Sequence, residues 1–322
     1  MSNWGHVFAY DDNDSEIRNM TIHSVLVVGT GAIGALYGGM LSRAGVSVST
    51  VVRSDYSTVV SNGFQITSEI FGDFVFRPDF IHRDVCDHKE HPDVILICGK
   101  TITSYVDMIR PVVGPQTMIV LLQNGIGIET PYQIAFPSTL IVSGLAFVCV
   151  SRTAPGVVQH LDYGRLVLGV FPSGKDDRVD TLVQLFASVG VPAKLSETVA
   201  RDRWRKLVWN APFNPLSALL GQTTDQILSV PELCDLCRGL MSEVVDIAAS
   251  QGFRWDDDVV DRNIADTLKM APYKTSMLLD VEAGRPIERI SILEAPIAVA
   301  HEAGVPVPLM TTINALLKGK FN

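Results

Sequence analysis

Three polar side chains, each four residues after the last, could do chemistry on a carbonyl group. Lys206, Asn210 and Asn214 lie in an otherwise largely apolar run from Trp204 to Leu216. A spacing of four residues places them on roughly one face of a helix. A lysine ammonium can give a proton to a carbonyl oxygen, and two carboxamides can hold hydroxyl or carbonyl groups beside it. The pattern predicts a polar face in a cleft. A solvated helix face with scattered polar residues is the alternative.

Two prolines modify this expected helix. Pro212 and Pro215 lack an N–H group, so the carbonyls of Val208 and Ala211 lose their usual partners. We expect the helix to kink or end between Ala211 and Asn214. Asn214 would then diverge from the other two polar side chains.

A glycine-rich segment near the N-terminus predicts a dinucleotide-binding loop. A short apolar, β-branched run precedes it and a helical stretch follows. Its residues are Gly29, Thr30, Gly31, Ala32, Ile33 and Gly34. In such a unit the first glycine permits a tight turn, the second lets the backbone approach a pyrophosphate, and the third lets helix and strand pack closely. The helix N-terminus then offers N–H groups to the phosphates. A tight turn that binds nothing is the alternative.

Three further polar residues follow predicted strands. Arg53, Lys100 and Asn124 each come within two residues of the end of a short apolar run. Such runs, separated by helical stretches, imply a parallel sheet covered on both faces. Ligands bind outside the carboxyl ends of the strands in these sheets, so we expect all three residues to share an edge with the glycine loop. Lys100 as a surface lysine and Asn124 as a plain turn residue are the alternatives.

Arg53 bears on the choice of cofactor. Proteins that bind NAD usually carry an acidic residue at this position for the ribose 2′-hydroxyl. An arginine instead suits a 2′-phosphate, with which its planar cation can pair in a bidentate way. The residue therefore favours NADP(H), the alternative being an ordinary surface arginine.

The chain divides into three predicted parts. Residues 1–20 form a polar, acidic extension without the features of a signal peptide. Residues 21–197 are predicted to be an α/β domain with a Rossmann-type doubly wound sheet. Residues 198–322 are predicted to be an all-α domain for substrate binding or dimerisation, because their apolar residues recur every three to four positions. The main helices expected in this all-α domain are Pro231 to Gln251, Asp256 to Met270, Ile287 to Ala303 and Pro308 to Lys318.

Two segments of the first domain depart from simple strand–helix alternation. Residues 64–80 are broken by Gly72-Asp73 and predict an antiparallel excursion. Residues 141–170 hold two β-like runs around Ala154-Pro155-Gly156, which we interpret as late strands of the same domain. Residues 176–189 are expected to form its last helix.

Composition excludes several classes of function. The chain has 26 basic and 35 acidic residues, for a net charge of −9, so no nucleic-acid partner is expected. No stretch is apolar enough to predict a membrane span. Five cysteines form no disulfide framework, which favours the cytoplasm. His82, His88 and His91 lie in a polar loop without further ligands, so no metal site is predicted. A small-molecule substrate is expected, and a homodimer is possible.

With both halves in view, the chain resembles the ketopantoate reductase (2-dehydropantoate 2-reductase) family, from about Thr21 to the C-terminus. The motifs after the glycine loop are more diagnostic than the glycines, which many oxidoreductases share. The motifs that carry the resemblance are the glycine loop, Arg53, Gly99-Lys100, Gln123-Asn124-Gly125-Ile126-Gly127, the Trp204–Leu216 run, and Ser276-Met277-Leu278-Leu279-Asp280 followed by Glu288.

The resemblance implies NADPH-dependent reduction of a 2-oxo acid to a 2-hydroxy acid. The leading hypothesis is reduction of 2-dehydropantoate to (R)-pantoate in pantothenate and coenzyme A biosynthesis. By matching position, Lys206 would be the general acid, and Glu288 would bind the substrate and help orient the lysine. Asn210, Asn214 and Ser276 would hold the carboxylate and hydroxyl groups.

The remaining motif residues concern the cofactor. The resemblance implies that Lys100 and Asn124 sit against the nicotinamide and substrate and that Arg53 takes the 2′-phosphate. Pro212 and Thr224 depart from the family pattern, which leaves the acyl group of the substrate open. Two alternatives stay open: a related NADP-dependent dehydrogenase acting on another hydroxy acid, an oxo acid or an imine, and a non-catalytic redox sensor that binds NADP(H).

Overall fold

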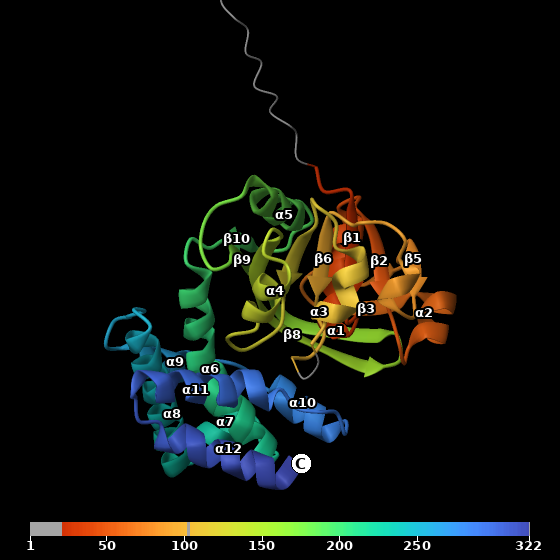
Figure 1. Ribbon diagram of the computed structural model, residues 1–322. Coiled ribbons are helices and arrows are strands. Elements are labelled where there is room, and N and C mark those ends of the chain that lie inside the picture. The colour runs from red at the N-terminus through yellow and green to blue at the C-terminus, as the bar shows by residue number, and fades with distance from the viewer. Residues whose placement is uncertain (1–20, 102–103, 322) are drawn as a thin grey trace, which may run out of the picture.

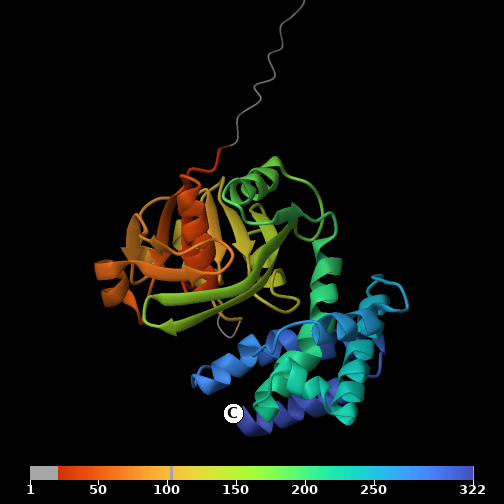
Figure 2. The same cartoon turned by 180° about the vertical axis from the view of Figure 1, so that it is seen from behind.

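The computed structural model describes residues 21–101 and 104–321. A ten-stranded sheet with its helices forms one body, and a cluster of helices forms a second (Figures 1 and 2). The strands run in the order β4-β3-β9-β8-β7-β6-β1-β2-β5, and β10 pairs with β9. Their bounds are β1 (Ser24–Val28), β2 (Ser47–Val51), β3 (Phe64–Ser68), β4 (Phe74–Phe76), β5 (Phe80–His82), β6 (Val94–Ile97), β7 (Met118–Leu121), β8 (Leu140–Ala154), β9 (Val157–Val170) and β10 (Ala193–Leu195).

Helices cover both faces of the sheet, as predicted for a doubly wound domain. Val25 and Val27 of β1 point into one buried cluster, beneath α1 (Ala32–Arg43) and α5 (Asp177–Ser188). Leu26 and Val28 alternate into a second cluster on the opposite face. The short helices on that side and at the edge of the sheet are α2 (Tyr56–Asn62), η1 (Val85–Asp87), α3 (Val106–Ile109), η2 (Arg110–Val112) and α4 (Thr130–Ala135).

The sheet is mixed rather than purely parallel. Strands β5, β2, β1, β6, β7 and β8 pair in parallel, whereas β8 pairs antiparallel with β9, and β3 with β4. The prediction of an antiparallel excursion in residues 64–80 is confirmed, as is that of two late strands in residues 141–170. Only Pro155 and Gly156 connect β8 to β9. A turn of two residues can join antiparallel strands but not parallel ones.

The second body consists of helices, as predicted. Their bounds are α6 (Val199–Leu220), α7 (Thr224–Leu228), α8 (Pro231–Ser250), α9 (Val259–Leu268), α10 (Ser276–Glu282), the π-helical turn η3 (Ile290–Glu294), α11 (Ala295–Ala303) and α12 (Pro308–Phe321). The expected single helix from Ile287 to Ala303 is wrong in its first part. Ile287 and Glu288 lie before the π-helical turn, a local geometry that often occurs at functional sites.

Helix α6 passes from the sheet domain into the helical domain (Figures 1 and 2). The expectation that it could end between Ala211 and Asn214 is wrong, because the helix continues through Pro212 and Pro215. Both prolines are buried, and α8, α10 and α12 pack against α6. Tertiary packing therefore offsets the lost backbone hydrogen bonds. The three predicted polar residues consequently stay on one continuous helix.

Two sequence-based expectations concern the ends of the chain and membranes. The predicted extension, residues 1–20, lies outside the described residues. Within the part of the chain that the structure describes, no helix has both the length and the apolar composition needed to cross a bilayer.

Candidate active site

The glycine loop leaves open space at the start of α1. Gly29 has a φ of +82°, and a Cβ there would lie 2.3 Å from the backbone nitrogen of Gly99. Gly31 caps α1, and a Cβ built on it would meet no atom within 4 Å. No side chain caps this helix in the described chain, so its first N–H groups are free to bind an anion. The loop therefore fits a pyrophosphate group.

The four predicted ligand-binding positions share one edge of the sheet. Strands β7, β6, β1 and β2 are consecutive neighbours and run parallel, so their carboxyl ends lie together. The glycine loop follows β1, Arg53 follows β2, Lys100 follows β6 and Asn124 follows β7. Arg53 is exposed, and the one hydrogen bond that its guanidinium forms among the described residues is to the Met108 sulfur, at 3.8 Å. It is therefore free to pair with a phosphate.

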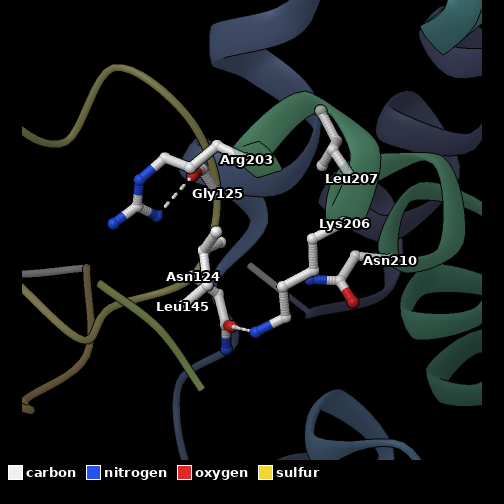
Figure 3. A pocket seen from close by; sticks show the side chains of 7 residues that line it. All are labelled: Asn124, Gly125, Leu145, Arg203, Lys206, Leu207 and Asn210. Atoms are coloured by element: carbon white, nitrogen blue, oxygen red, sulfur yellow. Dashed lines mark hydrogen bonds between the residues drawn. The ribbon is translucent and has the colours of Figure 1, made fainter. Parts of the chain in front are cut away.

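Lys206 reaches this edge from α6. Its Nζ donates hydrogen bonds to Asn124 Oδ1 at 2.8 Å and to the Ala146 carbonyl at 2.7 Å. The same nitrogen lies 5.3 Å from the centroid of the Phe147 ring. Figure 3 shows Lys206 beside Asn124 and Asn210 in a small recess. The recess is lined by Asn124, Gly125, Leu145, Arg203, Lys206, Leu207 and Asn210.

The surroundings of Lys206 make its ammonium easy to deprotonate. Burial is the largest cause, and the nearby positive charge of Arg203 adds to it, so that the pKa falls from 10.5 to about 7. The carboxylate of Glu288 acts in the opposite direction and raises the pKa. A group whose pKa lies near neutral pH can both give and regain a proton under working conditions.

Arg203, which the sequence reasoning missed, fixes α6 to the sheet. Its guanidinium forms an ion pair with Glu129, and both side chains are buried. It also donates hydrogen bonds to Ser143 Oγ at 2.6 Å and to the carbonyls of Gln123 and Gly125 at 2.9 and 3.0 Å. Two further carbonyls accept from its Nη2 atom. Lys206, one turn later, is thereby held beside the end of β7 and the middle of β8.

A second set of contacts, which we name the clasp, joins the domains at the end of β6. It comprises Lys100, Thr101, Asp280, Glu288 and Ser291. The Lys100 ammonium pairs with Asp280 and lies 3.7 Å from Glu288 Oε2. Glu288 Oε1 accepts hydrogen bonds from the N–H and the hydroxyl of Thr101, at 3.1 and 3.2 Å. The hydroxyls of Thr101 and Ser291 lie 2.8 Å apart.

Within the clasp, Glu288 is not a direct hydrogen-bond partner of Lys206. Its hydrogen bonds within the described chain go to Thr101, and its influence on Lys206 is through charge. Asp280, part of a motif noted in the sequence, had no predicted role. It also accepts from Arg285 Nε at 3.0 Å, so it lies between two cations.

The conformation and packing of Gly125 explain why glycine follows Asn124 in the motif after β7. Its φ is +92°, and a Cβ there would lie 2.4 Å from both Cβ and the carbonyl oxygen of Ser291. The Ile126 N–H donates to that same carbonyl at 3.2 Å. The motif after β7 is therefore packed directly on the π-helical turn of the other domain.

The three predicted substrate-binding residues keep their polar groups available. Asn210 and Asn214 are buried on α6, and Ser276 begins α10, which packs beside α6. Only Asn210 lines the recess in Figure 3. None of the three side chains forms a hydrogen bond with another described residue. Their polar atoms are also absent from the buried groups that lack a partner, so they reach solvent and are open to a polar ligand.

Comparison with known proteins places the chain in a family. The family described as Ketopantoate reductase PanE/ApbA matches residues 25–173, and its C-terminal counterpart matches residues 198–321. A 2-dehydropantoate 2-reductase from Nostoc is 33% identical over 91% of this chain and 93% of its own length. The crystal structure of 2-dehydropantoate 2-reductase from Methylococcus capsulatus has a TM-score of 0.86 at 43% identity, covering 92% of this chain and 96% of that one. The chain belongs to the ketopantoate reductase family.

Membership of the ketopantoate reductase family confirms the resemblance drawn from the motifs. The protein is an oxidoreductase of the kind that acts on CH–OH groups, and this family uses NADPH. The fold alone is shared with a D-mandelate dehydrogenase solved with NADH, which is 20% identical with a TM-score of 0.84 over 92% of this chain and 98% of that one. The roles of individual side chains stay predictions.

Proposed function

We propose that this protein reduces 2-dehydropantoate to (R)-pantoate with NADPH, as a step of pantothenate and coenzyme A biosynthesis. The observation that carries the proposal is the position of Lys206. Its ammonium lies at the carboxyl edge of the sheet, beside Asn124. Its pKa of about 7 suits a group that donates a proton to a carbonyl oxygen.

The cofactor would lie along the edge formed by β1 and β2. The open loop at Gly31 and the free start of α1 would hold its pyrophosphate, and Arg53 its 2′-phosphate. When bound, NADPH supplies the hydride that reduces the carbonyl carbon. We assign residues 21–197 to this nucleotide-binding domain and 198–322 to the helical domain that completes the site. A homodimer remains a prediction.

Lys206 would act on the oxygen of the same carbonyl group. Negative charge develops on that oxygen as the carbon is reduced, and a nearby ammonium stabilises it. Transfer of the Lys206 proton then gives the hydroxyl group, and the neutral amine regains a proton from water. Asn124 and the Ala146 carbonyl would keep the ammonium aimed at this position.

The helical domain would hold the rest of the substrate. The unpartnered polar groups of Asn210, Asn214 and Ser276 suit the carboxylate and hydroxyl groups of a 2-oxo acid. Glu288 would bind a substrate hydroxyl and favour the protonated form of Lys206. Lys100, held by Asp280 and Glu288, would contact the nicotinamide and substrate.

A substrate panel tests the proposal. NADPH consumption would be followed with 2-dehydropantoate, pyruvate, 2-oxoisovalerate and no substrate. We expect fast consumption only with 2-dehydropantoate. Consumption that is faster with another 2-oxo acid would reassign the substrate within the same chemistry. NADPH binding without turnover of any oxo acid would instead favour a redox sensor.

Arg53→Ala tests the choice between NADPH and NADH. Losing a bidentate, charge-assisted contact should raise KM for NADPH by about tenfold or more, while KM for NADH should not change. Steady-state assays with both cofactors measure this difference. Arg77→Ala, a change at another exposed arginine of the same domain, is the control. Equal effects on both cofactors would contradict the assignment.

A further inference from the structure

A second cavity lies on the other side of α6, outside the site described above. Its volume is about 390 Å³. It is formed by the first turns of α6, by the segment between α8 and α9, and by the start of α9. Its lining residues are Arg201, Arg205, Arg254, Trp255, Asp256, Val259 and Arg262. Arg205 and Lys206 are adjacent, but successive residues of a helix project about 100° apart, so they line different cavities.

The positive charges of this cavity are only partly balanced. Arg262 forms ion pairs with Asp256, at 2.8 Å, and with Asp258. The side chains of Arg201, Arg205 and Arg254 form no ion pair with any carboxylate of the described residues. Three unpaired guanidinium groups in one hollow stand out in a chain with nine more acidic than basic residues.

Of these residues, Arg205 gives the strongest indication of an anion-binding site. Its side chain is half-buried and makes no hydrogen bond to another described residue. Burial lowers its pKa, and the positive charges of Arg262 and Arg201 lower it further, whereas the carboxylates of Asp266 and Asp258 act in the opposite direction without reversing the shift. A partly desolvated cation without a direct anionic partner costs free energy, and a bound anion would reduce that cost.

The neighbouring groups fit an organic anion. Arg201 lies over the Trp255 ring, 5.7 Å from its centroid, and donates to the Arg254 carbonyl at 3.3 Å. These contacts fix one guanidinium and one aromatic ring at the wall of the cavity. Its volume falls within the range of about 300–1,000 Å³ that is usual for small-molecule sites. Guanidinium groups bind phosphate oxygens in a bidentate way.

We propose that this cavity binds a phosphorylated small molecule carrying at least two negative charges. Arg205 and Arg254 make the principal contacts with the phosphate oxygens, and Arg201 and Trp255 form the adjoining wall. The site is distinct from that of the reaction proposed above, because none of its lining residues lines the Lys206 recess.

Calorimetric titration tests the proposal on the whole protein. Pyrophosphate and ADP would be titrated at physiological salt with NADPH in excess, which occupies the glycine-loop site. We expect saturable binding by the unaltered protein. Arg205→Gln and Arg254→Gln should each weaken it by about tenfold, the usual cost of one charge-assisted hydrogen bond. Arg77→Gln removes an exposed arginine elsewhere and should leave the affinity unchanged.

Two outcomes overturn the proposal. One is the absence of saturable binding of either probe by the unaltered protein. The other is an Arg205→Gln/Arg254→Gln double variant with the affinity of the unaltered protein, which would place the probe at another site. Arg254 is exposed, so its single variant keeps the test valid even if Arg205→Gln does not fold.

Discussion

Arg203 and Lys206 are cations one turn apart on α6, but their surroundings differ. The Arg203 guanidinium meets a carboxylate, a hydroxyl and four backbone carbonyls. The Lys206 ammonium meets one amide oxygen, one carbonyl and the face of the Phe147 ring. Arg203 has a direct anionic partner in Glu129, whereas Lys206 lacks one and titrates near neutral pH.

The difference teaches how one helix can separate anchoring from chemistry. A buried cation paired with a carboxylate fixes the position of its helix. A buried cation with only neutral acceptors can donate its proton to a substrate. The positive charge of Arg203 also lowers the pKa of Lys206, so the anchor tunes the proton donor. Each prediction below changes one side of this comparison.

The largest expected effect is on activity, from Lys206→Ala. Loss of a general acid should lower kcat/KM by about 10²–10⁴-fold, while NADPH binding is kept. Steady-state assays and a direct NADPH titration measure the two quantities. Lys194→Ala, at an exposed lysine of β10, is the matched control. Turnover retained in the Lys206 variant would sink the role of proton donor.

The next effect is on stability, from breaking the Arg203–Glu129 pair. Arg203→Gln leaves a buried carboxylate without its cation and should lower the free energy of unfolding by about 3–5 kcal/mol. Chemical denaturation measures this change. The exposed pair of Arg110 with Asp107 offers a control, since Arg110→Gln should cost only about 0–1 kcal/mol. Equal losses in both variants would show that Arg203 is not an anchor.

Asn124→Asp would give Lys206 the kind of partner that Arg203 has. For the unaltered protein we expect kcat/KM to fall as pH rises through about 7, because the ammonium loses its proton. A carboxylate favours the charged ammonium and should move this fall to higher pH by about 1–3 units. Asn124→Ala removes the acceptor without adding charge and should produce no upward shift. The pH profile of kcat/KM decides, and an unmoved profile for Asn124→Asp would contradict the pairing.

The smallest effect is expected from Glu288→Gln. The Glu288 carboxylate raises the pKa of Lys206, so its loss should move the fall in kcat/KM to lower pH, by less than about one unit. Asp280→Asn is a useful comparison, since Asp280 pairs with Lys100 in the same clasp. A shift to higher pH for the Glu288 variant would reverse the assigned sign.

The sheet edge could be predicted because its signals are local. The turn at Gly29 and the position of Arg53 after a strand depend on a few neighbouring residues, and parallel strands bring such ends together. The Lys206–Asn210–Asn214 spacing likewise survived folding. The predicted end of the helix at the prolines was wrong, because their local cost was judged without the helices that pack around α6.

The Arg203–Glu129 pair, which anchors α6 to the sheet, and the clasp could not be predicted from local patterns. Arg203 stands between Arg201 and Arg205 in a run that resembles a solvated helix face, and nothing near Glu129 in sequence marks its partner. Contacts between residues so far apart depend on how the two domains dock. The π-helical turn that brings Ser291 against Gly125 is equally a result of packing rather than of propensity.

Because α6 is continuous and is anchored at Arg203, a tilt about that residue as fulcrum would displace the two parts of the helix unequally. A helix rises about 1.5 Å per residue, so Lys206 lies about 4.5 Å from the fulcrum and Leu220 about 25 Å from it. A tilt of about 10° would displace Leu220 by roughly 4 Å and Lys206 by less than about 1 Å. Such a tilt would therefore move the far helices much more than the proton donor, and it would have to break the clasp, which ties those helices to the sheet.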